Sequence, residues 1–320
     1  TGILGGMYPA LAITRINMLT TLKGKVSETF GKKITLRKIL VTSQFTISIA
    51  LISVSAIIYN QLRFMTQYPL GFDQELVVNI PLFSENMNNI FAGFDEDLRR
   101  KTNAFEEKLL TSPHIQAVTL SNVPPGLGAV SRMTHVEGRE EETIFVPCMA
   151  IDYDFMETYG LEVVAGRAFN KEAGTDHISS FVINEEAVKS FGWSDPDSAI
   201  GKKIEMEGRE GNVVGVVKDF HFLPLSSSMS SMLMVVSVRD FNFFSVKLEA
   251  SGITEALAFM EAQWREFFPE KSFEYHFLDQ SLEERYHTER RIGKIIGIFS
   301  GLAIIVSCLG AYGLVMFSAQ

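Results

Sequence analysis

The sequence predicts an α+β protein in which two transmembrane helices flank an external domain, and three observations support this fold class. Two long runs, Ile39 to Leu62 and Ile295 to Gln320, contain no Lys, Arg, Asp or Glu. Strand and helix patterns alternate between the two runs. A strongly basic segment precedes the first run, and a long acidic stretch follows it.

Each uncharged run is long enough for a helix that crosses a bilayer, which needs about 20 residues. Buried core helices are the alternative, because Ser, Thr and Gln recur in the first run, but a soluble helix of this length normally has a charged face. We therefore predict spans over residues 39–62 and 288–320. The apolar residues 1–13 predict the end of a preceding span, and we expect the chain to be a piece of a longer membrane protein.

The charge distribution predicts the orientation. Residues 14–38 contain seven basic side chains and one acidic side chain, a net charge of +6, which favours the cytoplasmic side. The whole chain carries −9 and the residues from Glu289 onward carry +2, so residues 39–288 carry −17. We expect residues 63–287 to be translocated, although four basic residues lie on their side of the second span: Arg285, Arg290, Arg291 and Lys294. The acidic balance argues against nucleic acid as a partner.

Two strand–helix–strand patterns lie at the ends of the external domain. The first covers residues 75–126 and the second residues 242–279. Two βαβ units predict one sheet with parallel strands and helices packed on a face. Five further strand patterns between them predict an inserted β-rich subdomain. We therefore divide the external domain into residues 63–143, the insertion 144–224, and residues 225–287.

One short stretch resembles an active site. Lys218, Asp219 and His221 directly follow a predicted strand, and Asp219 and His221 would point to the same side of it. Several serines follow, but no Gly-x-Ser-x-Gly nucleophile turn occurs in the chain. A structural turn is the favoured interpretation, and we predict no catalytic residue.

Other chemistry has little support in the sequence. The six histidines have no short metal-binding spacing, and neither Cys148 nor Cys308 has a ligand neighbour, so we predict no metal site and no other cofactor site. The Gly-Lys dipeptides lack the first glycine of a phosphate-binding loop. Cys148 belongs to the external domain and Cys308 to a span, so we expect no disulfide.

Small residues in the second span predict close helix packing. Gly293, Gly297 and Gly301 form two overlapping Gly-x₃-Gly spacings, which let helices approach closely in lipid. We expect Gly301 to lie against a neighbouring helix. The hydroxyl and amide side chains of residues 43–55 would add hydrogen bonds between helices. The basic segment 14–38 would lie on anionic lipid or contact a partner protein.

Several stretches together resemble FtsX/MacB-like ABC transporter permeases of the Bacteroidetes type. "GGMYPALAITRINMLTTLKGK" resembles the end of their first membrane core, and "LRKILVTSQFTISIALI" resembles the span that opens the second half. "GWSDPDSAIGKKIEM" and "GNVVGVVKDFHFLPL" resemble their external domain. "ERRIGKIIGIFSGLAIIVSCLGAYGLVMFSAQ" resembles the next span. The resemblance covers nearly the whole chain.

The resemblance implies a fold and a function. Residues 63–143 and 225–287 would form a porter-like subdomain, and 144–224 a sabre-like insertion. The chain would be a noncatalytic permease subunit in the cell inner membrane, with residues 63–287 periplasmic. Its implied partners are a cytoplasmic ABC ATPase, membrane lipid and a second permease half in a dimer or pseudo-dimer. Force would pass through the spans and through the helices that continue from them, residues 61–67 and 281–294.

Two other functional classes remain open from the sequence. A membrane-anchored sensor with an external ligand-binding domain has the same order of spans. A membrane-anchored hydrolase would need an external catalytic cluster, which the sequence does not show.

Overall fold

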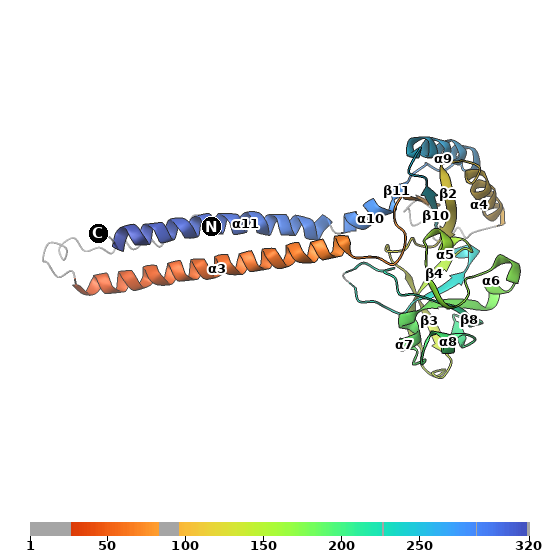
Figure 1. Cartoon of the computed structure of the whole chain (residues 1–320), viewed down its shortest axis with the longest axis horizontal. Helices are drawn as coiled ribbons and strands as arrows, with labels where there is room; N and C mark the ends of the chain where they lie inside the picture. The colour runs from red at the N-terminus through yellow and green to blue at the C-terminus, as the bar shows by residue number, and fades with distance from the viewer. Residues whose placement is uncertain (1–26, 83–95, 226, 286, 319–320) are drawn as a thin grey trace. The chain divides into compact units, whose positions relative to one another are not determined.

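The computed structural model describes residues 27–82, 96–225, 227–285 and 287–318 (Figure 1). The chain forms two compact units, one of residues 1–63 and 288–320, the other of residues 64–287. We call the first the helical unit and the second the external unit. The expectations for residues 1–13 and for most of the basic segment 14–38 lie outside the described residues.

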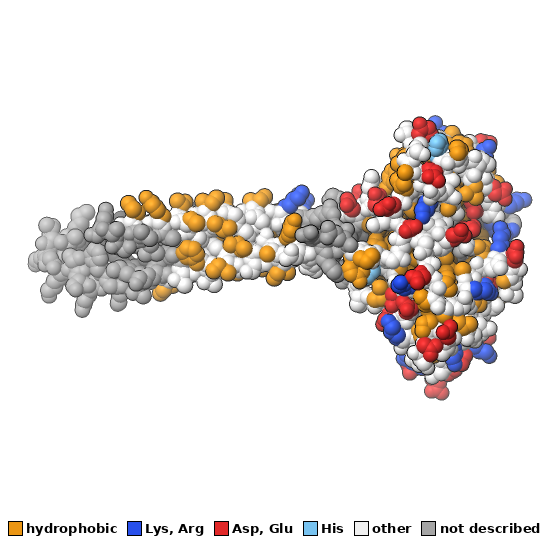
Figure 2. Space-filling view, in the orientation of Figure 1, with side chains coloured by type: hydrophobic (Ala, Val, Ile, Leu, Met, Phe, Trp, Pro, Cys, Tyr) orange, Lys and Arg blue, Asp and Glu red, His pale blue; other side chains and the backbone are white. Residues whose placement is uncertain are grey.

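Two long helices form the described part of the helical unit. Helix α3 covers Ser27–Gln67 and helix α11 covers His287–Ser318. Each contains a segment long and apolar enough to cross a membrane, Thr42–Gln61 in α3 and Arg291–Gly310 in α11. Large apolar side chains of both helices are exposed, as Figure 2 shows, and Ile57 and Ile298 are 64% and 70% accessible. Exposure of this extent suits lipid as the surrounding solvent.

The two ends of the external unit form a four-stranded antiparallel sheet. Its strands are β1 (Val77–Pro81), β2 (Ile115–Ser121), β10 (Phe243–Leu248) and β11 (His276–Phe277), in the spatial order β11-β1-β10-β2. Helix α4 (Glu96–Leu109) connects β1 to β2, and α9 (Ile253–Phe267) connects β10 to β11. This is the split βαβ arrangement of ferredoxin-like folds, and we call it the ferredoxin-like half.

The two predicted βαβ units build one sheet, as expected, but the two strands of each unit do not pair with each other. Both units exist, but β10 lies between β1 and β2, and β1 lies between β10 and β11. Every neighbouring pair in this half is antiparallel as a result. Each helix crosses over a strand that belongs to the other unit, so neither unit can form its sheet alone.

Helices α4 and α9 cover one face of this sheet. Phe105 of α4 packs edge-on against Phe244 of β10, with ring centroids 5.1 Å apart, and against Trp264 of α9 at 5.5 Å. All three side chains are fully buried. Apolar contacts of this density fix the two helices on the sheet.

The middle of the external unit is a sheet that closes on itself. Its strands are β3 (Val130–Val136), β4 (Ile144–Ile151), β6 (Ser180–Asn184), β7 (Lys203–Met206), β8 (Arg209–Val217) and β9 (Leu233–Val236). They pair in the circular order β4-β3-β7-β8-β6-β9-β4, and β5 (Val163–Gly166) adds to β8. Closure removes the free edges of a small sheet. We call this part the barrel half.

The barrel half is wider than the range 144–224 that the sequence suggested. Strands β3 and β9 lie outside that range, yet β3 pairs with β4 and β7, and β9 pairs with β4 and β6. The strands of the barrel half run from Val130 to Val236. The division into residues 63–143, 144–224 and 225–287 stays a prediction.

Short helices connect the barrel strands. They are α5 (Phe155–Thr158), α6 (Asp176–Ser179), α7 (Glu185–Ser190) and α8 (Pro196–Ala199). Asn184 ends strand β6 and begins α7, because its side chain accepts a hydrogen bond from the N–H group of Ala187. The carboxylate of Asp195 caps α8 in the same way, by accepting from Ser198.

The two halves join through β2 and β4. These strands share one residue pair, Ser121 and Ile151. Asn122 donates its backbone N–H to the carbonyl of Ala150 at 2.9 Å and accepts the N–H of Ala150 on its side chain at 3.0 Å. Apolar packing adds to these contacts, because Val77 of β1 and Leu278 lie in one buried cluster with Met149, Val217 and Met234 of the barrel half.

Candidate functional site

The Lys218–His221 turn follows β8, as predicted, and each of its side chains contacts a structural partner. Lys218 donates to Glu162 at 2.7 Å on the surface. Asp219 accepts from the side chain of Asn184 at 2.9 Å and from the N–H group of Glu186 at 2.8 Å. His221 packs against the edge of the Tyr68 ring, with centroids 5.1 Å apart. Asp219 therefore holds the start of α7 on the end of β8.

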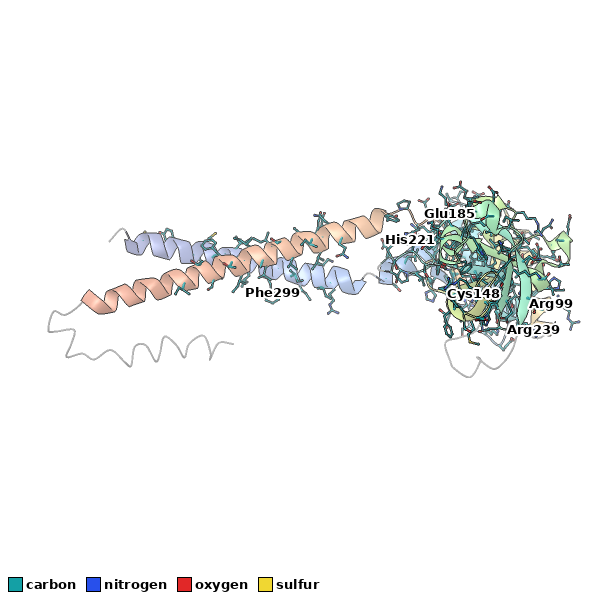
Figure 3. The ribbon with its side chains drawn as sticks, turned by 90° about the horizontal axis from the view of Figure 1, so that it is seen from below. Arg99, Cys148, Glu185, His221, Arg239 and Phe299 are labelled. Carbon is teal, nitrogen blue, oxygen red and sulfur yellow. The ribbon has the colours of Figure 1, made fainter. Side chains whose placement is uncertain are left out.

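The electrostatics of this turn disfavour an Asp–His ion pair. Burial raises the pKa of Asp219 and lowers the pKa of His221, so both groups are shifted toward their neutral forms. Ser231, a member of the serine run, is bonded to the hydroxyl of Ser190. Figure 3 shows His221 on the same side of the external unit as Glu185, away from Arg99 and Arg239. That the turn has a structural role stays a prediction.

A second cluster of polar groups, which no sequence pattern indicated, lies at the join of the two halves. Carboxylate oxygens of Glu106, Asp152 and Asp154 lie within 4.8 Å of one another. Glu106 comes from α4, and the two aspartates follow β4. Asp152 accepts hydrogen bonds from the hydroxyl of Thr119 and from the N–H group of Leu120, the latter at 2.5 Å. The carboxylate of Asp152 thus connects the end of β4 to β2.

Two of these carboxyl groups bind protons unusually tightly. Burial raises the pKa of Asp152 to about 8 and that of Glu106 to about 7, and the nearby charge of Asp154 raises the pKa of Glu106 further. Carboxylate oxygens so placed can share a proton, or they can bind a cation from outside. Residues 106 and 152 are far apart in the sequence, and only a fold that brings α4 beside β4 reveals the cluster.

The contact between the spans is made by small polar residues. The hydroxyl groups of Ser48 in α3 and Ser307 in α11 are 2.8 Å apart, and both serines are buried. A Cβ atom at Gly310 would lie 3.2 Å from Oε1 of Gln44, and one at Gly297 would lie 3.9 Å from the hydroxyl of Ser55. Close approach of this kind is how helices associate in lipid.

Gly301 does not face α3, so the expectation that it lies against a neighbouring helix stays a prediction. Among the described residues, a Cβ atom at Gly301 would meet no atom within 4 Å. Gly297 and Gly310 are the glycines that face α3. Ser48 of the first span forms one of the expected hydrogen bonds between helices, to the hydroxyl of Ser307 in α11. It lies one turn from Gln44.

The comparison with protein families decides the assignment. The family model described as the MacB-like periplasmic core domain matches residues 44–259. The chain belongs to this family. It is a MacB/FtsX-like component of an ABC-type transporter permease, with an external domain between two apolar helices.

Solved structures similar to this permease component come from several bacteria. The periplasmic region of MacB from Actinobacillus actinomycetemcomitans shares 14% identity over 69% of this chain and 98% of that chain, with a TM-score of 0.48. The extracellular domain of the noncanonic ABC-type transporter YknZ from Gram-positive bacteria shares 17% identity over 62% and 97%, with a TM-score of 0.44. A domain of a putative permease from Porphyromonas gingivalis shares 17% identity over 52% and 77%, with a TM-score of 0.37. A search among curated proteins gave no match.

The raised pKa values predict a pH-dependent stability of the permease's external unit. The folded unit keeps protons on Asp152 and Glu106 that the unfolded chain releases above about pH 4. Their stabilising contribution is complete below about pH 4 and is lost, by on the order of 1 kcal/mol per pH unit for each group, as the pH rises to about 7 for Glu106 and about 8 for Asp152. Asp152→Asn cannot ionise, so its stability relative to the wild type should improve between pH 5 and pH 9.

Urea unfolding of residues 64–287 at a series of pH values gives the free energy of unfolding of each variant relative to the wild type. Glu107→Gln, a change at the exposed neighbour of Glu106, is the control, and its free energy of unfolding relative to the wild type should not vary with pH. If the relative free energy of unfolding of Asp152→Asn were also independent of pH, the raised pKa values would be contradicted.

The contact between the permease's spans predicts a specific disulfide. In a chain with Cys308→Ala, cysteines at Ser48 and Ser307 should form a disulfide in the membrane under mild oxidation, because the two hydroxyl oxygens are 2.8 Å apart. Cysteines at Ile47 and Ser307 are the matched control, since the side chain of Ile47 is exposed. Equal cross-linking of both pairs, measured by gel shift, would show that α3 and α11 do not pack as described.

Proposed function

We propose that the chain is a noncatalytic subunit that couples ATP hydrolysis by a separate cytoplasmic ABC ATPase to movement of its external unit. The family match supports a role in an ABC-type transporter. Export or mechanical transmission of the ATPase cycle is the proposed task. The chain would lie in the cell inner membrane, with residues 63–287 in the periplasm.

One observation carries this proposal. Helix α3 leads through residues 68–76 into β1, and β11 leads through α10 (Leu278–Arg285) toward α11. Strands β1 and β11 are direct neighbours, with Val78 opposite Phe277 and Asn79 opposite His276. The two spans are thus connected to adjacent strands of one sheet. A change in either span would act on the same pair of strands.

The sheet behind β1 and β11 is suited to passing on a displacement. The strand β10 pairs with β1 over five residues and with β2 over six, and helices α4 and α9 pack on it through large aromatic side chains. Close-packed interiors deform little and transmit strain. The ferredoxin-like half would therefore move as one piece.

The interior of the external unit supports a noncatalytic role. Burial raises the pKa of the Cys148 thiol to about 12, so this cysteine is not a thiolate nucleophile at neutral pH. Asp219 caps α7, and Asp176 is buried in a bidentate ion pair with Arg167, with N–O distances of 2.6 and 2.9 Å. Each of these polar groups has a structural partner.

The remaining partners follow from the same proposal. The basic segment 14–38 would lie on anionic lipid or contact the ATPase, and a second permease half would complete the membrane part. Both spans expose apolar side chains on several sides, which leaves surface for further helices or lipid. The alternative of a membrane-anchored sensor lacks the support that the family match gives to a transporter.

Labelling of single cysteines tests the proposed topology. A cysteine at Ser251, which is exposed in the external unit, should react with a membrane-impermeant thiol reagent in intact cells whose outer membrane is permeabilised. A cysteine at Ser27 should react only after the inner membrane is opened, because the positive-inside rule places it in the cytoplasm. The background carries Cys148→Ala and Cys308→Ala. The reverse pattern would contradict the orientation, and with it the proposed function.

A further inference from the structure

The linker between α3 and β1, residues 68–76, contacts the barrel half before it enters the sheet of the ferredoxin-like half. The carbonyl of Leu70 accepts a hydrogen bond from the N–H group of His221 at 2.8 Å. Asp73 donates its own N–H group to the carbonyl of Tyr159, also at 2.8 Å. The linker is thus bonded to two separate segments of the barrel half.

One aromatic side chain of the linker is buried in the core that the barrel strands share. Phe72 forms T-shaped pairs with Tyr159 and Phe220, with ring centroids 6.1 and 6.3 Å apart. It lies in the same buried cluster as Met149 and Met234 of the barrel strands. A buried aromatic ring contributes a large apolar contact area with a specific geometry, so Phe72 anchors the linker at this point.

The linker approaches the Lys218–His221 turn too closely for a side chain at Gly71. A Cβ atom at Gly71 would lie 2.9 Å from Cβ of Phe220 and 3.1 Å from the carbonyl oxygen of Asp219. The rings of Tyr68 and His221 form a further T-shaped pair, with centroids 5.1 Å apart. Contacts of this closeness leave the linker little freedom to slide along the turn.

The turn that receives the linker is itself fixed on the barrel half. Asp219 binds the start of α7, and the carbonyl of Phe222 accepts from the N–H group of Gly128 at 3.1 Å. Phe220 and His221, which lie between these two attachments, contact the linker. The stretch therefore holds the barrel half with some of its residues and the linker with the others.

The helix that leads toward the second span reaches the same place. Leu282 of α10 lies 2.6 Å from the position that a Cβ atom at Gly126 would take, and the Phe72 ring lies 3.3 Å from that position. Leu278 of α10 is fully buried in the cluster that contains Phe72. The segments that lead to the two spans therefore meet beside Phe72.

We propose that Tyr159, Phe220 and His221 form a clamp that fastens the linker 68–76 to the barrel half, so that a displacement of α3 moves the barrel half directly. The inference rests on the proposed function, in which α3 transmits the ATPase cycle. Asp219 is a positioning residue of the clamp, because it fixes the turn on α7. The stretch that resembled an active site thus has a mechanical role, since close-packed contacts deform little and transmit strain.

Hydrogen exchange of the full chain in lipid nanodiscs tests the clamp without the ATPase. Gly71→Ala should speed the exchange of the Asp73 and His221 amides by at least about tenfold, because the added methyl group separates the linker from the turn. Gly208→Ala is the matched control. Both glycines have a φ angle of +84°, but a Cβ atom at Gly208 would meet no atom of the described residues within 4 Å. The control should leave both amides within about twofold of the wild type.

A milder variant provides the same test if Gly71→Ala does not fold. Tyr68→Ala removes the ring that contacts His221 and should speed the exchange of the His221 amide by about threefold or more. Tyr275→Ala is its control, because Tyr275 is 40% accessible and Tyr68 is 38% accessible. Tyr275 precedes β11 and packs against Phe277, so its removal should leave the His221 amide unchanged.

The complex with the ATPase tests the mechanical consequence. Spin labels at Ser194 in the barrel half and Ser251 in the ferredoxin-like half, both exposed, report the distance of each half from the membrane surface. In the wild type both distances should change through the ATP cycle. In Gly71→Ala the change at Ser194 should shrink relative to the change at Ser251.

Three results would overturn the clamp. They are unchanged exchange of the Asp73 and His221 amides in both linker variants, equal acceleration in a variant and its control, or an undiminished change at Ser194 in a Gly71→Ala chain whose amides exchange faster. Failure of the proposed function looks different. In that case neither label would move in the wild type while ATP is hydrolysed, and the exchange rates would still decide whether the clamp exists.

Discussion

The strands of the external unit form one sheet because β2 and β4 share a residue pair, and a buried apolar cluster common to both halves holds the unit together. On one side of this pair lies a ferredoxin-like half with two helices on its face, and on the other side a barrel that closes on itself. The carboxylate of Asp152 reinforces the pair by binding Thr119 and Leu120 of β2. The same join brings Glu106 of α4 beside Asp152 and Asp154.

The connection to the membrane places a second constraint on the unit. Both spans reach the sheet through strands that are neighbours, β1 and β11, at the far side of the ferredoxin-like half from the join. A displacement of β1 would reach the barrel half directly, because Val77 of β1 and Leu278 of α10 lie in one buried apolar cluster with Met149, Val217 and Met234 of the barrel strands. Proton binding at Asp152 and Glu106 would change the stability of the contact between β2 and the end of β4.

Much of the fold was predictable because its signals are local. Two uncharged runs gave the spans, and amphipathic patterns gave α4 and α9 at nearly their observed bounds. Strand β3 was missed because Arg132 and His135 interrupt its apolar pattern, and β9 was missed although its four residues are all apolar. The strand pattern at residues 178–188 is in fact β6 followed by α7, since Asn184 caps a helix there. Antiparallel pairing could not be predicted, because it depends on which distant strand inserts between two others.

The sites follow the same rule. The Lys218–His221 turn was visible as a motif because its residues are adjacent, but its partners Asn184, Glu162 and Tyr68 come from elsewhere in the chain. The carboxylate cluster joins α4 to the end of β4 and leaves no pattern in the sequence. For the spans, the glycine spacing indicated close packing correctly, but it could not show that Gly297 and Gly310, and not Gly301, face α3.

A distance measurement on the reconstituted complex tests the central claim most directly. Spin labels at Ser251 and Ser194, exposed residues of the ferredoxin-like and barrel halves, would report on both parts of the external unit in a chain without Cys148 and Cys308. Together with paramagnetic lipid headgroups, they give the distance between the two labels and the distance of each label from the membrane surface. The proposed coupling predicts that ATP binding by the partner subunit shifts the distance of Ser251 from the membrane, and that ATP hydrolysis restores it. An unchanged distance of Ser251 through a cycle in which the partner hydrolyses ATP would contradict the coupling.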